Sequence, residues 1–138
     1  SAASDVYKRQ PLGLSLWLDF EVEMGRRVPP SCFSPQPRVH SRLIRLEPLD
    51  RLAAIESDID RRLYRQVTSL CFTDRRRKLR NLLKRAPRRL SRIPGWHRER
   101  WTGAMNSLKD HPLMDERPDM LEPEDWVNLC ELILAFES

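Results

Sequence analysis

The stretch from Val28 to Ser41, VPPSCFSPQPRVHS, sets one aromatic residue, Phe33, among prolines at positions 29, 30, 35 and 37. Proline holds its own φ near about −65° and pushes the preceding residue into the extended region. The segment is therefore expected to be a stiff, open loop that presents Phe33. The residues that follow, Val39 to Leu46, have the β-branched and alternating character of a strand, so we expect the loop to be anchored on a sheet.

The segment before this loop also has the pattern of a strand. Apolar residues occupy every second position from Leu14 to Met24, and a period of two predicts a strand. Together with Val39 to Leu46 it forms a β-loop-β unit. Two strands alone are only marginally stable in water, so the unit is expected to join a larger sheet. Residues 1–10 show no periodicity and are interpreted as an unstructured leader.

From Asp50 onward the apolar residues follow the period of a helix. Asp50 is a candidate N-cap for a first helix that reaches Phe72. A second helix is expected to begin at Thr73 and to stop before Pro87, because proline cannot continue a helix interior. The chain after residue 48 is therefore predicted to be all-α.

Two more helices are expected near the C-terminus. One covers residues 96–109, and the last begins at Pro123, since proline is favoured at the first helical position; the residues between them are turn-rich. Trp96 and Trp101 could stack on bases, but we assign them to core or interdomain packing, which is the commoner role of tryptophans beside a short helix.

Composition limits the class of protein. A chain of 138 residues is one domain's worth, and 40% apolar content is enough for a modest core. Cys32, Cys71 and Cys130 form no C-x-x-C pair, which argues against a disulfide framework or zinc site and for a reducing compartment; all three are expected to be buried. No apolar run approaches the roughly 18 residues that span a bilayer.

Positive charge is concentrated in one segment, and the net charge of +5 favours a polyanionic partner. From residue 75 to 92 there is no acidic residue, and the basic residues are Arg75, Arg76, Arg77, Lys78, Arg80, Lys84, Arg85, Arg88, Arg89 and Arg92. A solvated helix face is one interpretation. We favour contact with nucleic acid, because like charges this dense repel one another unless an anion neutralises them. The acidic last helix is expected to face away from that nucleic acid.

The proline-rich stretch matches a family pattern, V-P-x-x-x-F-x-P-x-P-x-V-x-S. The matching residues are Val28, Pro29, Phe33, Pro35, Pro37, Val39 and Ser41. This pattern resembles the proline-rich motif of the ribosomal RNA adenine dimethyltransferases, which lies at the end of a Rossmann-type methyltransferase domain. The alternative is a proline-rich turn between two ordinary strands.

A second pattern, F-x-x-R-R-K-x-L-R-N-x-L, resembles the signature of the same family's C-terminal helical domain. It is matched by Phe72, Arg75, Arg76, Leu79, Arg80, Asn81 and Leu83. Arg77 stands where the family usually has lysine and Lys78 where it often has threonine, so positive charge is kept. The sequence LEPEDW at residues 121–126 is similar to the opening of the family's terminal helix.

The resemblance implies an α+β fragment. Residues 11–47 would be the last strands and proline-rich loop of a Rossmann-type methyltransferase sheet, and residues 48–138 a helical RNA-binding domain. The intact enzyme would transfer methyl groups from S-adenosylmethionine to adenine N6 in small-subunit ribosomal RNA. The glycine-rich turn that holds S-adenosylmethionine and the N/D-L/I-P-Y/F motif are not found, so the fragment is expected to bind RNA without binding this cofactor or catalysing alone.

The resemblance also implies site residues and partners. Phe33 would stack on the flipped-out target adenine, with Pro35 and Pro37 keeping it rigid. The RNA-binding residues would be Arg75, Arg76, Arg77, Lys78, Arg80, Lys84, Arg85, Arg88 and Arg89. The expected partner is ribosomal RNA or the small ribosomal subunit, and no membrane contact is expected. The protein is expected to be a monomer in the cytoplasm or an organelle.

Two other functions remain open from the sequence. One is a non-enzymatic helical RNA-binding or ribosome-assembly module, and the other is a helical DNA-binding protein. A metal site is not expected, because His40, His97 and His111 are scattered without partners at ligand spacing.

Overall fold

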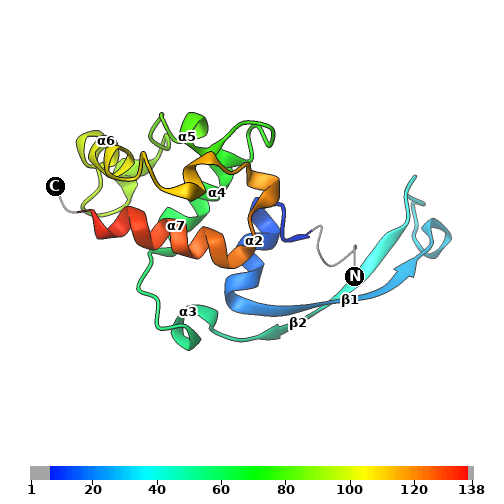
Figure 1. Cartoon of the computed structure of the whole chain (residues 1–138). Helices are drawn as coiled ribbons and strands as arrows, with labels where there is room; N and C mark the ends of the chain where they lie inside the picture. The colour runs from blue at the N-terminus through cyan, green and yellow to red at the C-terminus, as the bar shows by residue number, and fades with distance from the viewer. Residues whose placement is uncertain (1–6, 137–138) are drawn as a thin grey trace.

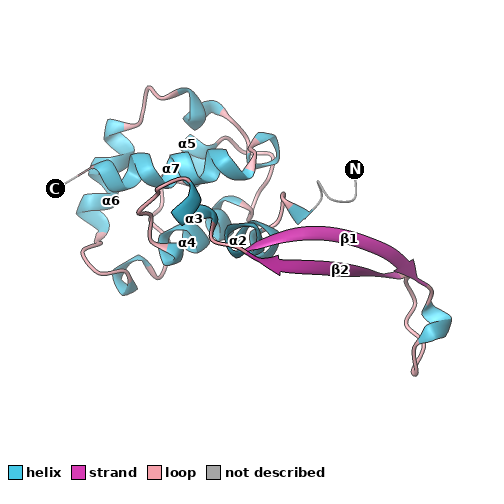
Figure 2. Ribbon diagram, turned by 90° about the horizontal axis from the view of Figure 1, so that it is seen from below, coloured by secondary structure: helices cyan, strands magenta, loops and turns pink. Residues whose placement is uncertain are grey.

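The helices and strands separate in space into a helical body and a long hairpin that projects from it (Figure 1). The computed structural model describes residues 7–136. The body contains α2 (Pro11–Asp19), α3 (Arg51–Ala54), α4 (Arg61–Cys71), α5 (Leu79–Leu82), α6 (Arg98–Ser107) and α7 (Pro123–Ala135). The hairpin is β1 (Phe20–Val28) and β2 (Ser41–Pro48), inserted between α2 and α3 (Figure 2). The chain is therefore an α+β fold, as expected.

The predicted strand from Leu14 to Met24 is wrong in its first half, which forms α2. Proline stands in the first turn of this helix, and Leu14, Trp17 and Leu18 are buried on one face. These three positions follow helical spacing, while Leu14 and Leu18 also fit a period of two, so the sequence pattern is ambiguous. Packing against α4 favours the helix. In a strand, Trp17 would lie on the same face as the polar residues of this segment and could not be buried with Leu14 and Leu18.

The residues before α2 also belong to the folded body. Tyr7 packs against the core, and Arg9 Nε donates to the backbone oxygen of Asp119 at 3.1 Å. A Cβ on Gly13 would lie 1.6 Å from the carbonyl oxygen of Tyr7, so only glycine allows this approach. The prediction of an unstructured leader is therefore wrong for residues 7–10, and for residues 1–6 it lies outside the described chain.

The hairpin carries one apolar face. Val22 pairs with Leu46 and Met24 with Ile44 in an antiparallel ladder. Between Met24 and Arg27 the first strand has one extra residue relative to its partner, which is a β-bulge. The sheet has only these two strands among residues 7–136, and the larger sheet that the sequence predicts is not part of the described chain.

The predicted first helix is two helices. The Asp50 carboxylate accepts a hydrogen bond from the Ala53 amide at 3.1 Å and caps α3, which confirms the predicted N-cap. The helix then stops, with Glu56 in the left-handed region at φ 55°. Asp60 caps α4 by accepting from the Arg62 amide at 2.7 Å. The chain therefore has two start signals where the apolar period alone suggested continuity.

The predicted second helix is mostly loop. Only α5 is helical between α4 and the 3-10 turn Leu90–Arg92. Asp74 accepts from the Arg76 amide at 3.1 Å in a side-chain turn, and Lys78 has extended backbone. Like charges three or four residues apart in this stretch also disfavour a helix, because residues at that spacing face each other on a helix surface.

The last two predicted helices are confirmed as α6 and α7. The start of α7 has a capping box, in which the Asp125 carboxylate accepts a hydrogen bond from the Glu122 amide at 2.9 Å and the Glu122 side chain accepts one from the Asp125 amide. The turn-rich residues between the two helices form the 3-10 turns Pro112–Asp115 and Pro118–Met120. These caps and prolines are local signals, and they place α7 where the sequence predicts it.

The core lies between α2, α4, α6 and α7. Trp96 and Trp101 are buried in it with their rings edge to face, which confirms their assignment to packing. Cys71 and Cys130 are buried as expected, and burial raises the pKa of both thiols above the ordinary range. Cys32 is exposed, contrary to expectation, because it sits in the proline-rich loop away from the core.

Two tryptophans allow the core hydrogen bonding to be tested. Trp101 and Trp126 are both fully buried, but only Trp101 donates its indole N–H, to Leu83 O at 2.9 Å; that of Trp126 has no partner within residues 7–136. Replacing either with phenylalanine removes similar volume, while W101F also leaves the Leu83 carbonyl unpaired. We expect W101F to lower the free energy of unfolding by about 1–3 kcal/mol more than W126F in urea denaturation. Equal losses would contradict this.

Candidate nucleic-acid interface

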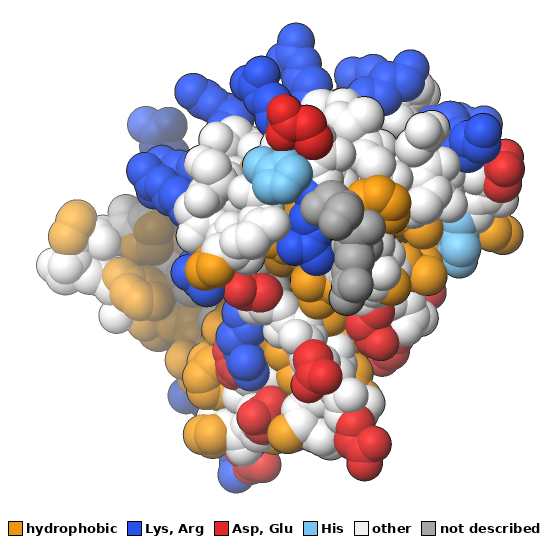
Figure 3. Space-filling view, turned by 90° about the vertical axis from the view of Figure 1, so that its left-hand side faces the viewer, with side chains coloured by type: hydrophobic (Ala, Val, Ile, Leu, Met, Phe, Trp, Pro, Cys, Tyr) orange, Lys and Arg blue, Asp and Glu red, His pale blue; other side chains and the backbone are white. Residues whose placement is uncertain are grey.

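The basic segment, residues 75–92, crosses one side of the helical body from the end of α4 toward α6. It is mostly loop, so its side chains do not form the helix face that the sequence predicts. Figure 3 shows Lys and Arg side chains gathered along the top of one face of the molecule, with most of the visible acidic side chains lower down. The segregation of charge along the sequence is thus kept in space.

Part of this charge is neutralised within the chain. Arg80 contacts Asp115, with Nε and Nη2 each 2.8 Å from Oδ1. Arg75 lies over the Phe72 ring and is 3.7 Å from the carboxylate of Asp119. These contacts tie the basic segment to the 3-10 turns before α7. The acidic end of the chain therefore supplies two carboxylates to the basic segment.

The rest of the basic segment is not paired in this way. Seven of its side chains form no hydrogen bond or ion pair within residues 7–136, namely those of Arg76, Arg77, Lys84, Arg85, Arg88, Arg89 and Arg92. All seven are exposed. Unpaired positive charge is therefore concentrated on the residues that precede and follow α5.

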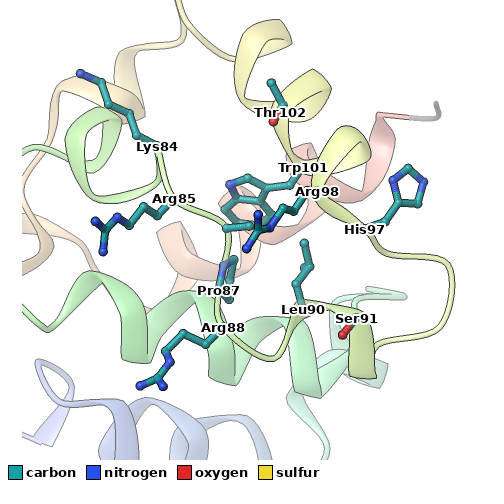
Figure 4. A pocket seen from close by; sticks show the side chains of 11 residues that line it. Lys84, Arg85, Pro87, Arg88, Leu90, Ser91, His97, Arg98, Trp101 and Thr102 are labelled. Atoms are coloured by element: carbon teal, nitrogen blue, oxygen red, sulfur yellow. The ribbon is translucent and has the colours of Figure 1, made fainter.

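Four cations line one cleft of about 630 Å³ between the loop after α5 and the start of α6. Lys84, Arg85 and Arg88 come from the loop, and Arg98 comes from α6 (Figure 4). Gly95, at φ +84°, allows the turn that brings α6 back over the loop. Arg98 is absent from the predicted RNA-binding set, and its only sequence signal is its place in the basic stretch after this turn.

The backbone of the cleft is held from two sides. Trp101 Nε1 donates to Leu83 O at 2.9 Å, and Gln66 Nε2 donates to Arg89 O at 3.0 Å. Leu90 is buried beneath the loop. These contacts attach residues 83–90 to α4 and α6, so the cations stand on a supported backbone even though the segment is not helical.

Phe33 follows the 3-10 turn Pro30–Cys32 between β1 and β2. This turn lies at the tip of the hairpin, at the opposite end of the molecule from α6 (Figure 2). The Phe33 amide donates to Pro30 O at 3.1 Å. The side chain is 43% exposed, and Pro35 is exposed beside it. The structure therefore presents Phe33 as the proline spacing predicts, but it does not bring Phe33 and the basic segment together.

The cationic cleft does not suit the sulfonium group of S-adenosylmethionine. The cations of the cleft would repel a positively charged sulfonium, and no carboxylate lines it. No group of three His, Cys, Asp or Glu side chains within residues 7–136 could hold a metal ion. No helix in this part of the chain is long and apolar enough to cross a membrane.

The sequence of this chain matches a protein-family model. The model for the ribosomal RNA adenine dimethylases matches residues 2–92, which contain the hairpin and the whole basic segment. The chain belongs to the ribosomal RNA adenine dimethylase family. Its proline-rich loop and basic segment are therefore elements of a known family of proteins.

Several curated relatives agree with this assignment. Ribosomal RNA small subunit methyltransferase A of Prochlorococcus marinus is 31% identical over 108 residues, which are 77% of this chain and 33% of that protein. A relative from Haloarcula marismortui is 32% identical over 130 residues, covering 94% of this chain and 41% of the relative. The chain thus spans about a third of the length of the first relative and about two fifths of the length of the second.

A solved structure shows the same fold. The crystal structure of a dimethyladenosine transferase from Plasmodium falciparum matches with a TM-score of 0.59 and 20% identity. The match covers 87% of this chain and 47% of that one. The arrangement of hairpin and helical body is therefore shared with that longer protein.

The second motif of the dimethylase family is partly structural in this chain. Phe72 packs against Trp126 with ring centroids 5.5 Å apart, and Leu79 and Leu83 are fully buried. Arg80 of the same motif is paired with Asp115. The motif therefore holds the start of the basic segment on the helical body.

The Arg80–Asp115 pair makes a pH prediction. The hydrogen bond from Arg80 holds the pKa of the Asp115 carboxyl below its ordinary value of 3.8. The pair therefore contributes stability above that value and loses it as the pH falls through the lowered pKa of the folded state. We expect D115N to lower Tm slightly at pH 6, since exposed pairs contribute little, and the difference from wild type to be smaller at pH 2.

The control for this measurement is E116Q. Glu116 is an exposed neighbour whose carboxylate has no ion pair within residues 7–136. This variant should unfold like the wild type at both pH values. A loss of Tm in D115N that is the same at pH 6 and pH 2 would contradict the assigned ion pair.

Proposed function

We propose that this chain is the C-terminal part of an S-adenosylmethionine-dependent adenine N6-dimethyltransferase that acts on small-subunit ribosomal RNA. The observation that carries the proposal is the family match over the hairpin and the basic segment. In this proposal the described residues bind RNA and supply one wall of the target-base site. The methyl donor would be held by residues upstream of this chain, and the part described here would not catalyse alone.

The exposed hairpin supports an upstream methyltransferase domain. Ile44 and Leu46 lie on its apolar face with 50% and 38% of their side chains exposed. Each strand also has one edge without a partner among residues 7–136. An exposed apolar face and open edges are unfavourable in water. We infer that the two strands complete a larger sheet, which in this family would be of the Rossmann type.

Phe33 fits the role of a wall for a flipped-out base. The N6 amine of adenine is conjugated with the ring and is a poor nucleophile, so the base must be extruded and its amine aligned with the methyl group. An exposed aromatic ring next to prolines can hold a base by stacking without moving itself. Pro35 and Pro37 would limit the motion of the loop on one side of Phe33.

In this proposal the protein is a monomer in the cytoplasm or in an organelle. Its partner is ribosomal RNA or the small ribosomal subunit. The unpaired cations of the basic segment support a polyanionic partner. The acidic helix α7 would face away from the RNA. RNA contact of this kind would set affinity and orientation, while Phe33 would act on the target base.

A helical RNA-binding module without catalysis is the second candidate. It is favoured by the helical body, which buries Leu14 of α2, Tyr64 of α4 and Ile133 of α7 in one core and needs no further domain to enclose them. Sequencing the gene upstream of the codon for Leu12 separates the two candidates. A glycine-rich turn followed by an N/D-L/I-P-Y/F motif in the same frame would support the methyltransferase, and closed frames would support the module.

Phe33 can be tested in the full-length enzyme. We expect F33A to lower turnover by about 5- to 150-fold, the equivalent of a base stack worth about 1–3 kcal/mol, with little change in RNA affinity. Single-turnover methylation and filter binding would measure the two effects. The matched control is I55A, which shortens an apolar side chain of similar exposure on the helical body. Unchanged turnover in F33A would remove Phe33 from the base site.

RNA binding by the present chain can be tested by its salt dependence. With about 6 to 10 phosphate contacts, affinity should fall by about 10³ to 10⁵ between 50 and 200 mM salt. Fluorescence anisotropy with a labelled RNA hairpin would measure it, and duplex DNA as competitor would separate RNA binding from DNA binding. A flat titration would contradict an electrostatic RNA interface.

A further inference from the structure

The cleft between residues 84–91 and the start of α6 has the properties of an anion site. Lys84, Arg85, Arg88 and Arg98 line it, and no aspartate or glutamate does. None of these four side chains has an ion pair within residues 7–136. Uncompensated like charges around one space cost folding stability, and a bound polyanion removes that cost.

The lining of the cleft favours a sugar-phosphate backbone over a base. Its two large apolar members, Leu90 and Trp101, are 3% and 1% exposed, so they present no open face. The indole N–H of Trp101 is already used by Leu83 O. Stacking on an apolar ring needs an exposed aromatic face with room for the base, which neither residue provides. The exposed groups of the cleft are the four cations, the imidazole of His97 and the hydroxyl-bearing Ser91 and Thr102. Cations and hydroxyl groups are the side chains that contact phosphate oxygens.

The size of the cleft indicates more than one anionic group. Its volume of about 630 Å³ lies in the range of sites that hold whole small molecules, about 300–1,000 Å³. A single phosphate would leave most of this space empty. The cations stand on two separate segments, the loop after α5 and the first turn of α6. A strand that runs through the cleft would contact both.

The other half of the basic segment differs in its contacts. Arg75 and Arg80 are engaged with Asp119 and Asp115, so an approaching phosphate would have to displace a carboxylate. The cations of the cleft need no such exchange. The structure thus distinguishes two groups within one basic run that the sequence presents as uniform.

We propose that the cleft binds consecutive phosphates of the RNA backbone through Lys84, Arg85, Arg88 and Arg98, while Arg75 and Arg80 act as structural ion pairs. This rests on the proposed function in one respect, namely that the chain binds RNA. It adds where the RNA strand lies, which cations hold it, and that this contact does not select the base sequence.

The test compares two double variants of the present chain in the same anisotropy titration. R88A/R98A removes two cations from the two sides of the cleft, and R75A/R80A removes the same charge from the structural pairs. Each lost phosphate contact lowers the slope of log affinity against log salt by about 1. For R88A/R98A we therefore expect a slope smaller by about 2, with Tm unchanged. For R75A/R80A we expect a lower Tm and the wild-type slope.

A pair of lysines provides the single-residue control. Lys84 and Lys109 are both exposed, and neither side chain has a hydrogen bond or ion pair within residues 7–136, but only Lys84 lines the cleft. K84E should weaken RNA binding by about tenfold or more, and K109E should leave it within about twofold of wild type, because a phosphate contact replaced by repulsion costs far more than a change of distant charge.

The outcomes are distinguishable from failure of the proposed function. Wild-type protein that binds no RNA would reject RNA binding itself. Wild-type binding with R88A/R98A and K84E unchanged, or with R75A/R80A losing the same slope at an unchanged Tm, would overturn the cleft and leave RNA binding in place. Competition by poly-L-glutamate as strong as by RNA would also overturn the proposal, in favour of an acidic protein partner.

Discussion

The hairpin has no core of its own, so its direction depends on the contacts at its base. Arg51 supplies two of these contacts: its Nε donates to Trp17 O at 2.6 Å, and its Nη2 lies 2.7 Å from Glu21. Its guanidinium also lies over the Trp17 ring, 4.7 Å from the centroid. Because Trp17 is buried in the helical body, these contacts join the first residues of β1 to the core.

A second arginine completes this junction. Arg61, in the first turn of α4, lies 2.7 Å from Asp19 at the end of α2 and 3.5 Å from Asp50, the cap of α3. Each exposed ion pair contributes little alone, but together they connect three helix ends around the start of the hairpin. The loop that carries Phe33 therefore extends from the body in a defined direction, and α6 lies at the end of the body away from the hairpin (Figure 1).

The two family motifs have different physical roles in this chain. The proline-rich motif makes few contacts with the body and keeps its shape through backbone restriction, which suits a loop that must meet something else. The second motif is half buried: its apolar residues pack in the core and Arg80 is paired with a carboxylate. Its role is to position the cations that follow it.

The sequence by itself determined the features that depend on neighbouring residues. Prolines around Phe33 specify an open loop, Asp50 caps a helix, and Pro123 begins one, because each of these residues acts on the backbone within a few positions. The change from a period of two to a helical period also located the hairpin's second strand and the helical part. The density of positive charge predicted a polyanionic partner.

Only the tertiary structure decided which ambiguous segments are helical and which positive charges are neutralised. Leu14 and Leu18 fit both a strand and a helix, and burial of Trp17 against α4 selected the helix. Arg80 and Arg88 look equivalent along the chain, but Asp115, 35 residues from Arg80, neutralises one of them. Backbone preferences are set locally, whereas the burial of a face and the pairing of a charge depend on residues that meet only after the chain has folded.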